Sequence, residues 1–194
     1  LVRVSQVRQL PCLHDSRDDM PWPLNASAVG KVLLRCWGDR ELISTETKTS
    51  TPLKETMMLR STETLDSLLE RQRGTLPDTF GARPLALAEG RMTMELTIAP
   101  WMMAPNGFLH AATQVMLADT CAGYATLAHL PEGAKGFTTL ELKSNFLGTA
   151  KQGILHVEAV AEHLGRTTQV WSATLFDDKG RRLSLFRCSQ IVLW

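Results

Sequence analysis

Residues Asn106 to Gly123 read NGFLHAATQVMLADTCAG, and the rest of the chain is organised around this stretch. It leads into a run from Ala111 to Ala128 in which nearly every residue is small or apolar, as is typical of a helix buried on all sides. Asp119 is the only charged residue in that run. A buried carboxylate without a partner is strongly unfavourable, so Asp119 needs a hydrogen-bond partner, a water molecule or a chemical role.

The residues around Asp119 favour a chemical role. Gly123 follows one helical turn later on the same face, where glycine costs about 1 kcal/mol relative to alanine and leaves a gap beside the carboxylate. This gap predicts a bound ligand. Before the helix, Asn106 and Gly107 predict a turn, and His110 stands where the first helical N–H groups have no intrahelical acceptor.

Unpaired N–H groups at the start of a helix attract negative charge. The backbone N–H of Ala111 would therefore hold a carbonyl oxygen that becomes negative during acyl transfer. We assign His110 a positioning role at the helix start. No second His or Cys stands near it at the spacing of metal ligands, so the sequence predicts no metal site.

Composition limits the possible partners. The chain of 194 residues suits one folded domain, and its formal net charge of +1 gives no strong field toward nucleic acid or an anionic membrane. Its 4 cysteines show no CxxC spacing, and neither a membrane-spanning apolar run nor a secretory segment is present in the sequence. These features predict a cytoplasmic protein that binds neither nucleic acid nor membranes.

The first part of the chain lacks the periodicity of a helix or a strand, and the segment from Thr45 to Thr56 has the composition of a linker. We therefore predict that residues 1–60 form a poorly ordered or loosely packed extension, with a short helix within Leu24 to Ile43 as the alternative. Met57 or Met58 would be a natural start for the folded part. We expect the residues before it to be dispensable for folding and catalysis.

The remainder, residues 61–194, predicts one α+β domain. A capping pattern and apolar spacing predict a short helix from Ser61 to Gly74, and alternating residues around Glu89-Gly90 predict a hairpin. After the buried helix, turn residues separate four strand candidates that should form an antiparallel meander: residues 138–147, 154–163, 167–177 and 182–194. A curved antiparallel sheet must then wrap around one long central helix, because that helix is too apolar for a surface.

The sequence resembles the hotdog-fold acyl-CoA thioesterases, specifically the phenylacetate-degradation (PaaI-like) family. The resemblance covers about residues 62–194. It rests on five stretches: GTLPDTFG (74–81), NGFLHA with LADTCAGYA (106–111 and 117–125), FTTLELKSNFLGTA (137–150), HLGRTTQVW (163–171) and FRCSQIVLW (186–194). The usual His-Gly-Gly of the family is His110-Ala111-Ala112 here. Asn106 stands four residues before the His, whereas several relatives place an Asn six before it.

The resemblance implies the hotdog fold and hydrolysis of acyl- or aryl-coenzyme A thioesters without a cofactor, coenzyme A being part of the substrate. It also implies a homodimer or a dimer-of-dimers tetramer with active sites at the dimer interface. By position, Asp119 would be the nucleophile or general base and the Ala111 N–H the oxyanion donor. The hydroxyl of Thr139 would hold the water or the carboxylate.

Asn145 and Arg166 complete the candidate substrate contacts, Arg166 as a partner for a coenzyme A phosphate. Each candidate also has a structural alternative: Asn145 would satisfy backbone groups at a strand end, Arg166 would be a solvated charge in a turn, and Thr139 an ordinary strand residue. Two other functions stay open. One is a non-catalytic acyl-CoA binding or sensor module, and the other is a hotdog-fold dehydratase or hydratase.

Overall fold

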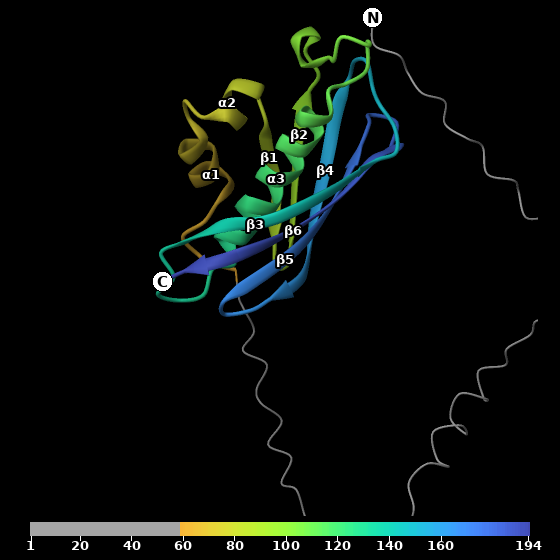
Figure 1. Cartoon of the computed structure of the whole chain (residues 1–194). Helices are drawn as coiled ribbons and strands as arrows, with labels where there is room; N and C mark the ends of the chain where they lie inside the picture. Colours follow the sequence, from red (N-terminus) through yellow and green to blue (C-terminus); the bar gives the residue numbers. More distant parts are fainter. Residues whose placement is uncertain (1–58) are drawn as a thin grey trace, which may run out of the picture. The chain divides into compact units, whose positions relative to one another are not determined.

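The computed structural model describes residues 59–194, and our predictions for residues 1–58 lie outside this range. Two helices, α1 and α2, precede a hairpin; a 3-10 turn, the long helix α3 and four more strands follow (Figure 1). The elements in chain order are α1 (Leu65–Gln72), α2 (Leu76–Phe80), β1 (Arg83–Ala88), β2 (Arg91–Thr97), η1 (Pro100–Met102), α3 (Ala111–Ala128), β3 (Gly136–Phe146), β4 (Ile154–Leu164), β5 (Thr168–Phe176) and β6 (Arg182–Leu193). Among residues 59–194, no helix combines the length and the apolar character needed to cross a membrane.

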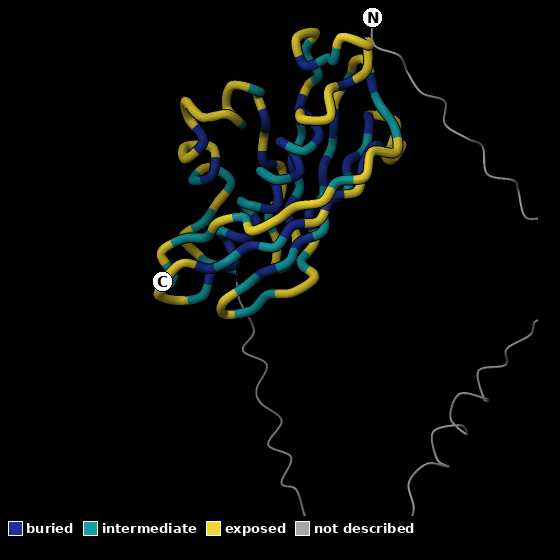
Figure 2. Tube along the Cα trace, in the orientation of Figure 1, coloured by how far each residue is buried: buried dark blue, intermediate teal, exposed yellow. Residues whose placement is uncertain are grey.

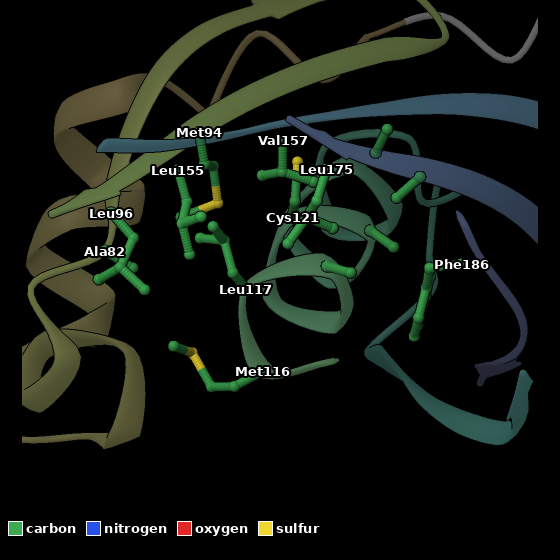
Figure 3. Packing of buried hydrophobic residues seen from close by; sticks show 14 of the residues in the cluster. Ala82, Met94, Leu96, Met116, Leu117, Cys121, Leu155, Val157, Leu175 and Phe186 are labelled. Carbon is green, nitrogen blue, oxygen red and sulfur yellow. The ribbon is translucent and has the colours of Figure 1, made fainter. Parts of the chain in front are cut away.

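The six strands form one antiparallel sheet in the order β1-β2-β4-β5-β6-β3, which curves around α3 (Figure 1). The predicted α+β arrangement is therefore confirmed. Within the sheet, Met94, Val157 and Leu175 stand opposite one another on β2, β4 and β5 and point toward the helix (Figure 3). On the helix side, Leu117 and Cys121 are fully buried against them. The core thus lies between the concave face of the sheet and α3, as the depth of burial along the chain also shows (Figure 2).

The predicted meander is right for β4, β5 and β6 but wrong for β3. Instead of pairing with β4, β3 lies beyond β6 at the edge of the sheet. The connection of residues 147–153 is longer than a hairpin loop and reaches up to about 23 Å when extended. It has to cross three strand spacings, which is about 14 Å. The turn residues there mark a crossover, because β2 and β5 already occupy both sides of β4.

Two features fix the ends of α3. At its start, the Nδ1 of His110 accepts a hydrogen bond from the N–H of Ala112 at 3.0 Å. At its end, the fully buried His129 ring is held through both nitrogens: Nδ1 lies 2.7 Å from the carbonyl of Ala125, and Nε2 accepts from the N–H of Gly90 at 2.8 Å. Since Gly90 turns the β1–β2 hairpin, His129 joins that hairpin to the end of the helix.

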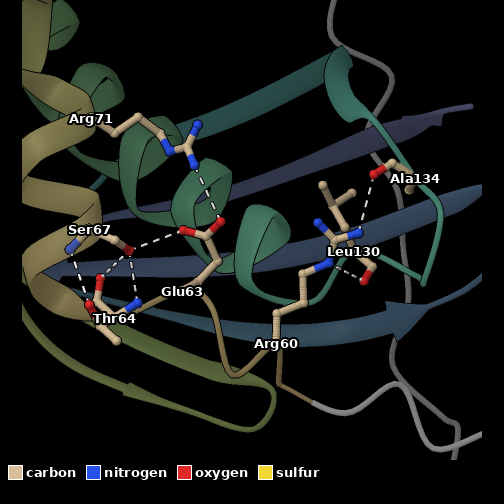
Figure 4. A network of polar contacts seen from close by, with 7 residues as sticks. All are labelled: Arg60, Glu63, Thr64, Ser67, Arg71, Leu130 and Ala134. Atoms are coloured by element: carbon tan, nitrogen blue, oxygen red, sulfur yellow. Dashed lines mark hydrogen bonds and ion pairs between the residues drawn. The ribbon is translucent and has the colours of Figure 1, made fainter.

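Polar contacts hold the beginning of the domain in place (Figure 4). Thr64 and Ser67 form a reciprocal capping box at the start of α1. Arg60 donates hydrogen bonds to the carbonyls of Leu130 and Pro131 at 2.9 and 2.6 Å. The folded domain therefore includes Arg60, one residue before the predicted start.

Candidate functional site

Asp119 lines a hollow of about 420 Å³ between α3, the first residues of β3 and the two short helices. We call this the Asp119 hollow. Its lining is mainly apolar and includes two cations, Arg71 and Lys135. The lining residues are Arg71, Pro77, Asp119, Thr120, Gly123, Tyr124, Leu127, Lys135, Gly136, Phe137 and Thr139. Three of the predicted site residues, Asp119, Gly123 and Thr139, therefore share one hollow.

The carboxylate of Asp119 is partly buried, and its Oδ1 is enclosed without a hydrogen-bond partner among the described residues. Burial raises the pKa of this group above its ordinary value. A carboxylate that has lost water without gaining a protein donor is more basic than a solvated one. It is therefore suited to take a proton from water or to attack a carbonyl carbon.

The predicted gap at Gly123 is narrower than the sequence suggests. A Cβ built on Gly123 would lie 3.3 Å from the ring of Phe137, so that ring shares the space left by the missing side chain. Gly123 and Phe137 still line the hollow together. The gap thus allows close packing of β3 on α3 as well as an opening beside Asp119.

Tyr124 is a lining residue that the sequence did not single out. Its hydroxyl donates to Oε1 of Gln72 at 3.2 Å, which fixes the ring in the wall. Burial raises the pKa of Tyr124 to about 12, so the hydroxyl keeps its proton. Arg71, at the margin, is paired with Glu63 at 3.3 Å.

A second hollow, of about 510 Å³, lies at the start of α3. We call it the Ala111 hollow. It is lined by Ala104, Asn106, Phe108, Leu109, His110, Ala111, Gln114, Phe146, Leu147, Gly148 and Thr149. The predicted residues Asn106, His110 and Ala111 meet here.

The N–H of Ala111 is available in this hollow. It has no acceptor among the described residues, whereas the next two N–H groups are taken by the ring and the carbonyl of His110. Ala111 is the first residue of α3, so its backbone is helical and alanine occupies it without strain. The Nδ1 of His110 thus caps the start of α3.

The loop before α3 is held by hydrogen bonds of its own. The N–H of His110 donates to the carbonyl of Met102 at 3.0 Å, and the N–H of Leu109 donates to Oγ1 of Thr149 at 2.9 Å. Asn106 accepts from the N–H of Phe108 through Oδ1 at 3.2 Å, and Gly107 has a φ of 78°, as the predicted turn requires. These contacts fix the position of the Ala111 N–H.

The two hollows are separate within one chain. Asp119 follows Ala111 by eight residues on a continuous helix, which places them about 12 Å apart along its axis. The stretch from Asn106 to Gly123 therefore lines two separate hollows.

Asn145 and Arg166 line neither hollow. Asn145 lies with Ser172 and Arg187 in a depression lined by β3, β5 and β6 residues. The guanidinium of Arg166 lies 4.6 Å from the centre of the Trp194 ring, a cation–π contact. The structure does not bring these two predicted substrate contacts to Asp119 or Ala111.

Gln114 lines the Ala111 hollow and was missed in the sequence. Its side chain is 2% exposed, and its Oε1 has no hydrogen-bond partner among the described residues. The available signal was a long polar side chain inside the mainly apolar run, five residues before Asp119.

Two other kinds of catalytic group are a bound metal ion and a reactive thiol, and the described residues bear on both. Within residues 59–194, no group of three His, Cys, Asp or Glu residues is arranged to hold a metal ion. Cys121 and Cys188 are buried free thiols, and burial raises the pKa of both, so neither is a ready thiolate nucleophile.

Comparison with known proteins identifies similar chains. Residues 106–184 match the family model of the thioesterase superfamily. A Pasteurella multocida protein named as an esterase is 33% identical over 102 residues, which cover 52% of this chain and 73% of that protein. The 1,4-dihydroxy-2-naphthoyl-CoA hydrolase of Listeria monocytogenes is 27% identical over 114 residues, covering 59% and 92% of the two chains. The crystal structure of a mutant thioesterase from Pseudomonas aeruginosa has a TM-score of 0.66 and 29% identity, over 70% of this chain and 98% of that one. These similarities confirm the fold expected from the sequence.

Proposed function

Because this chain belongs to the thioesterase superfamily, we propose that it hydrolyses acyl- or aryl-coenzyme A thioesters in a site that two copies of the chain build together. The products are the free acid and coenzyme A. The observation that carries the proposal is the partly buried, unpaired carboxylate of Asp119 in a largely apolar hollow.

In the reaction, Asp119 takes a proton from a water molecule whose oxygen bonds to the thioester carbon. The carbonyl oxygen becomes negative and is held by the N–H of Ala111, with the help of the helix dipole. When the intermediate collapses, the carbon–sulfur bond breaks, and the leaving thiolate takes the proton that Asp119 accepted from the water, which gives coenzyme A and restores the carboxylate. Direct attack by Asp119, followed by hydrolysis of the resulting anhydride, gives the same products. In both routes, the Thr139 hydroxyl is near enough to the hollow to orient the water or the carboxylate.

The distance between the half-sites supports the sharing of the site. One carbonyl group cannot lie within hydrogen-bond reach of both Asp119 and Ala111 of a single helix, because they are about 12 Å apart. The Asp119 hollow of one copy must then face the Ala111 hollow of another. The proposed assembly is a homodimer or a dimer-of-dimers tetramer.

The edge of the sheet supports the same assembly. β3 is the last strand on its side, and Leu140, Leu142 and Phe146 along it are exposed. An exposed edge strand with apolar side chains invites pairing with another strand. A second copy of the chain would cover these residues and supply the second half-site.

The hollow favours a hydrophobic acyl group. Tyr124, Leu127 and Phe137 line it, and an aromatic ring fits such walls. The Listeria relative is named for hydrolysing an aromatic thioester. A substrate panel should therefore contain both aryl- and alkyl-coenzyme A esters.

The test is release of free thiol from this panel by the unmodified protein and by Asp119→Asn. Loss of an essential acid or base lowers kcat by about 10² to 10⁴. The matched control is Asp66→Asn, an exposed carboxylate in the first turn of α1, which should keep the rate.

Three outcomes would contradict the proposal. Asp119→Asn with the rate of the unmodified protein would remove Asp119 from the chemistry. Tight binding of the esters without thiol release would indicate a sensor module. Hydration of an enoyl-coenzyme A without thiol release would indicate a hydratase.

A further inference from the structure

We propose that the carboxamide of Gln114 is a second hydrogen-bond donor to the thioester oxygen, beside the N–H of Ala111. This inference rests on the proposed function and adds a catalytic side chain to the same site. It starts from the state of Gln114 in the fold: the side chain is 2% exposed, its oxygen is unpaired, and it lines the Ala111 hollow.

Of the other three buried glutamines among the described residues, two are paired at both ends and the third at one end. Gln72 donates to the carbonyl of Ala82 at 2.8 Å and accepts from the Tyr124 hydroxyl. Gln169 donates to the carbonyl of His129 at 2.7 Å and accepts from the Trp171 indole at 3.2 Å. Gln190 donates to the Cys188 sulfur at 3.3 Å, although its oxygen is unpaired, and it lines neither hollow.

Gln114 differs because its side chain makes no hydrogen bond within residues 59–194. A buried polar group left unpaired is costly, so an amide at this position calls for a partner from outside the chain. An amide can rotate by 180° and exchange the positions of its oxygen and nitrogen. The unpaired oxygen therefore marks a space in which the Gln114 nitrogen can equally be placed as a donor.

The position of Gln114 on the helix directs its amide toward the Ala111 N–H. Gln114 follows Ala111 by three residues and therefore lies on the same face of α3. Long side chains on a helix lean toward its N-terminus and cover the turn before their own Cα. The amide of Gln114 thus reaches over the first turn, at the level of His110 and Ala111.

The other polar side chains of the Ala111 hollow each use an acceptor atom within the chain. Asn106 is exposed and accepts from the N–H of Phe108, and the Nδ1 of His110 accepts from the N–H of Ala112. Ala104 offers only a methyl group. The amide nitrogen of Asn106 and the Nε2 of His110 have no partner among the described residues, but they belong to exposed side chains that water can solvate. The Gln114 amide is buried, so it is the side chain that calls for a ligand, and a carbonyl oxygen with two lone pairs can accept from it and from the Ala111 N–H.

The test compares Gln114→Met with the unmodified protein in kcat, KM and melting temperature, on the best thioester of the panel. Methionine keeps the length of the side chain and removes both polar atoms. A donor to the developing oxyanion acts mainly in the transition state, so we expect kcat to fall about 10- to 100-fold with KM within about twofold. The melting temperature should stay level or rise, because an unpaired buried amide is lost.

Two further variants complete the experiment. Gln114→Glu keeps the shape but brings a negative charge to the oxyanion, so its kcat should fall below that of Gln114→Met. Gln169→Leu is the matched control, because it removes a buried amide that is fully paired. It should lower the melting temperature and leave kcat within about twofold.

Each outcome decides the proposal. Gln114→Met with an unchanged kcat, with a raised KM alone, or in an unfolded state would overturn it and give Gln114 a ground-state or structural role. If the unmodified protein releases no thiol from any ester, the proposed function fails and this inference fails with it. If the unmodified protein is active and Gln114→Met is equally active, only this inference fails.

Discussion

Replacing Ala111 by proline removes one N–H and little else, so it tests the oxyanion donor directly. Ala111 is the first residue of α3, the helical position where proline is best tolerated, because its N–H has no intrahelical acceptor. The preceding residue, His110, has φ −61° and ψ 134°, the extended conformation that a residue before proline prefers. The N–H itself has no acceptor among the described residues, so the substitution breaks no hydrogen bond there.

The expected effects on activity and stability therefore differ. Losing one oxyanion donor lowers kcat by about 10² to 10³, which corresponds to about 2.7 to 4 kcal/mol of transition-state stabilisation. Proline at a compatible site restricts the unfolded chain and adds about 0.4 to 1 kcal/mol of stability. We predict that Ala111→Pro is at least as stable as the unmodified protein and nearly inactive.

The assay is thiol release at saturating thioester, together with thermal unfolding of the same preparation. Ala111→Gly serves as the comparison, because it also alters the side chain but keeps the N–H; its kcat should stay at least about tenfold above that of Ala111→Pro. An Ala111→Pro protein that folds and turns over at the unmodified rate would refute the assignment of this N–H as oxyanion donor.

Three other predictions follow from the same structure. Burial raises the pKa of Asp119, and the proposed mechanism needs its ionised form. The kcat should therefore rise with pH around a midpoint above the usual value of about 3.9, and Asp119→Asn should lose this dependence. Burial lowers the pKa of His129, so the folded state favours the neutral ring. The stability that this ring contributes is complete above the unfolded pKa of about 6.5 and is lost as the pH falls below it. Urea unfolding at pH 7.5 and pH 5 will measure the difference in stability, and His129→Asn should reduce that difference. A chain starting at Met57 should keep its melting temperature and thioesterase rate, and a loss of either would make upstream residues part of the folded domain.

The elements predicted well were those with a strong local pattern. The run of mostly small or apolar residues specified α3 to its last residue, Ala128, and alternation along the second strand specified the β1–β2 hairpin. In contrast, the place of β3 depends on pairing with β6, whose paired residues lie 38 to 57 positions further along the chain, and no local pattern encodes that pairing. The helix α2 was missed because its five residues are too few to show a helical period, and so short a helix is stable only through its tertiary contacts.

Some residues of the candidate site could likewise be identified from the sequence, and others could not. Asp119 and Ala111 could be identified because a lone charge in an apolar helix and a helix start carry chemical meaning of their own. Asn145 and Arg166 could not be placed, since the face that a strand or turn residue occupies depends on the register of the sheet. Gln114 stands out only once its burial and lack of a partner are known.

The most direct test of a site built from two copies is complementation between two inactive variants. Asp119→Asn keeps the Ala111 half-site, and Ala111→Pro keeps the Asp119 half-site, so each parent alone should have at most about 1% of the unmodified rate. In a mixed dimer, one of the two sites combines the intact halves. Co-expressing the variants in equal amounts should therefore restore about a quarter of the unmodified rate, because random pairing makes half of the dimers mixed and half of their sites complete. A mixture of verified mixed dimers that is no more active than its parents would contradict the shared site.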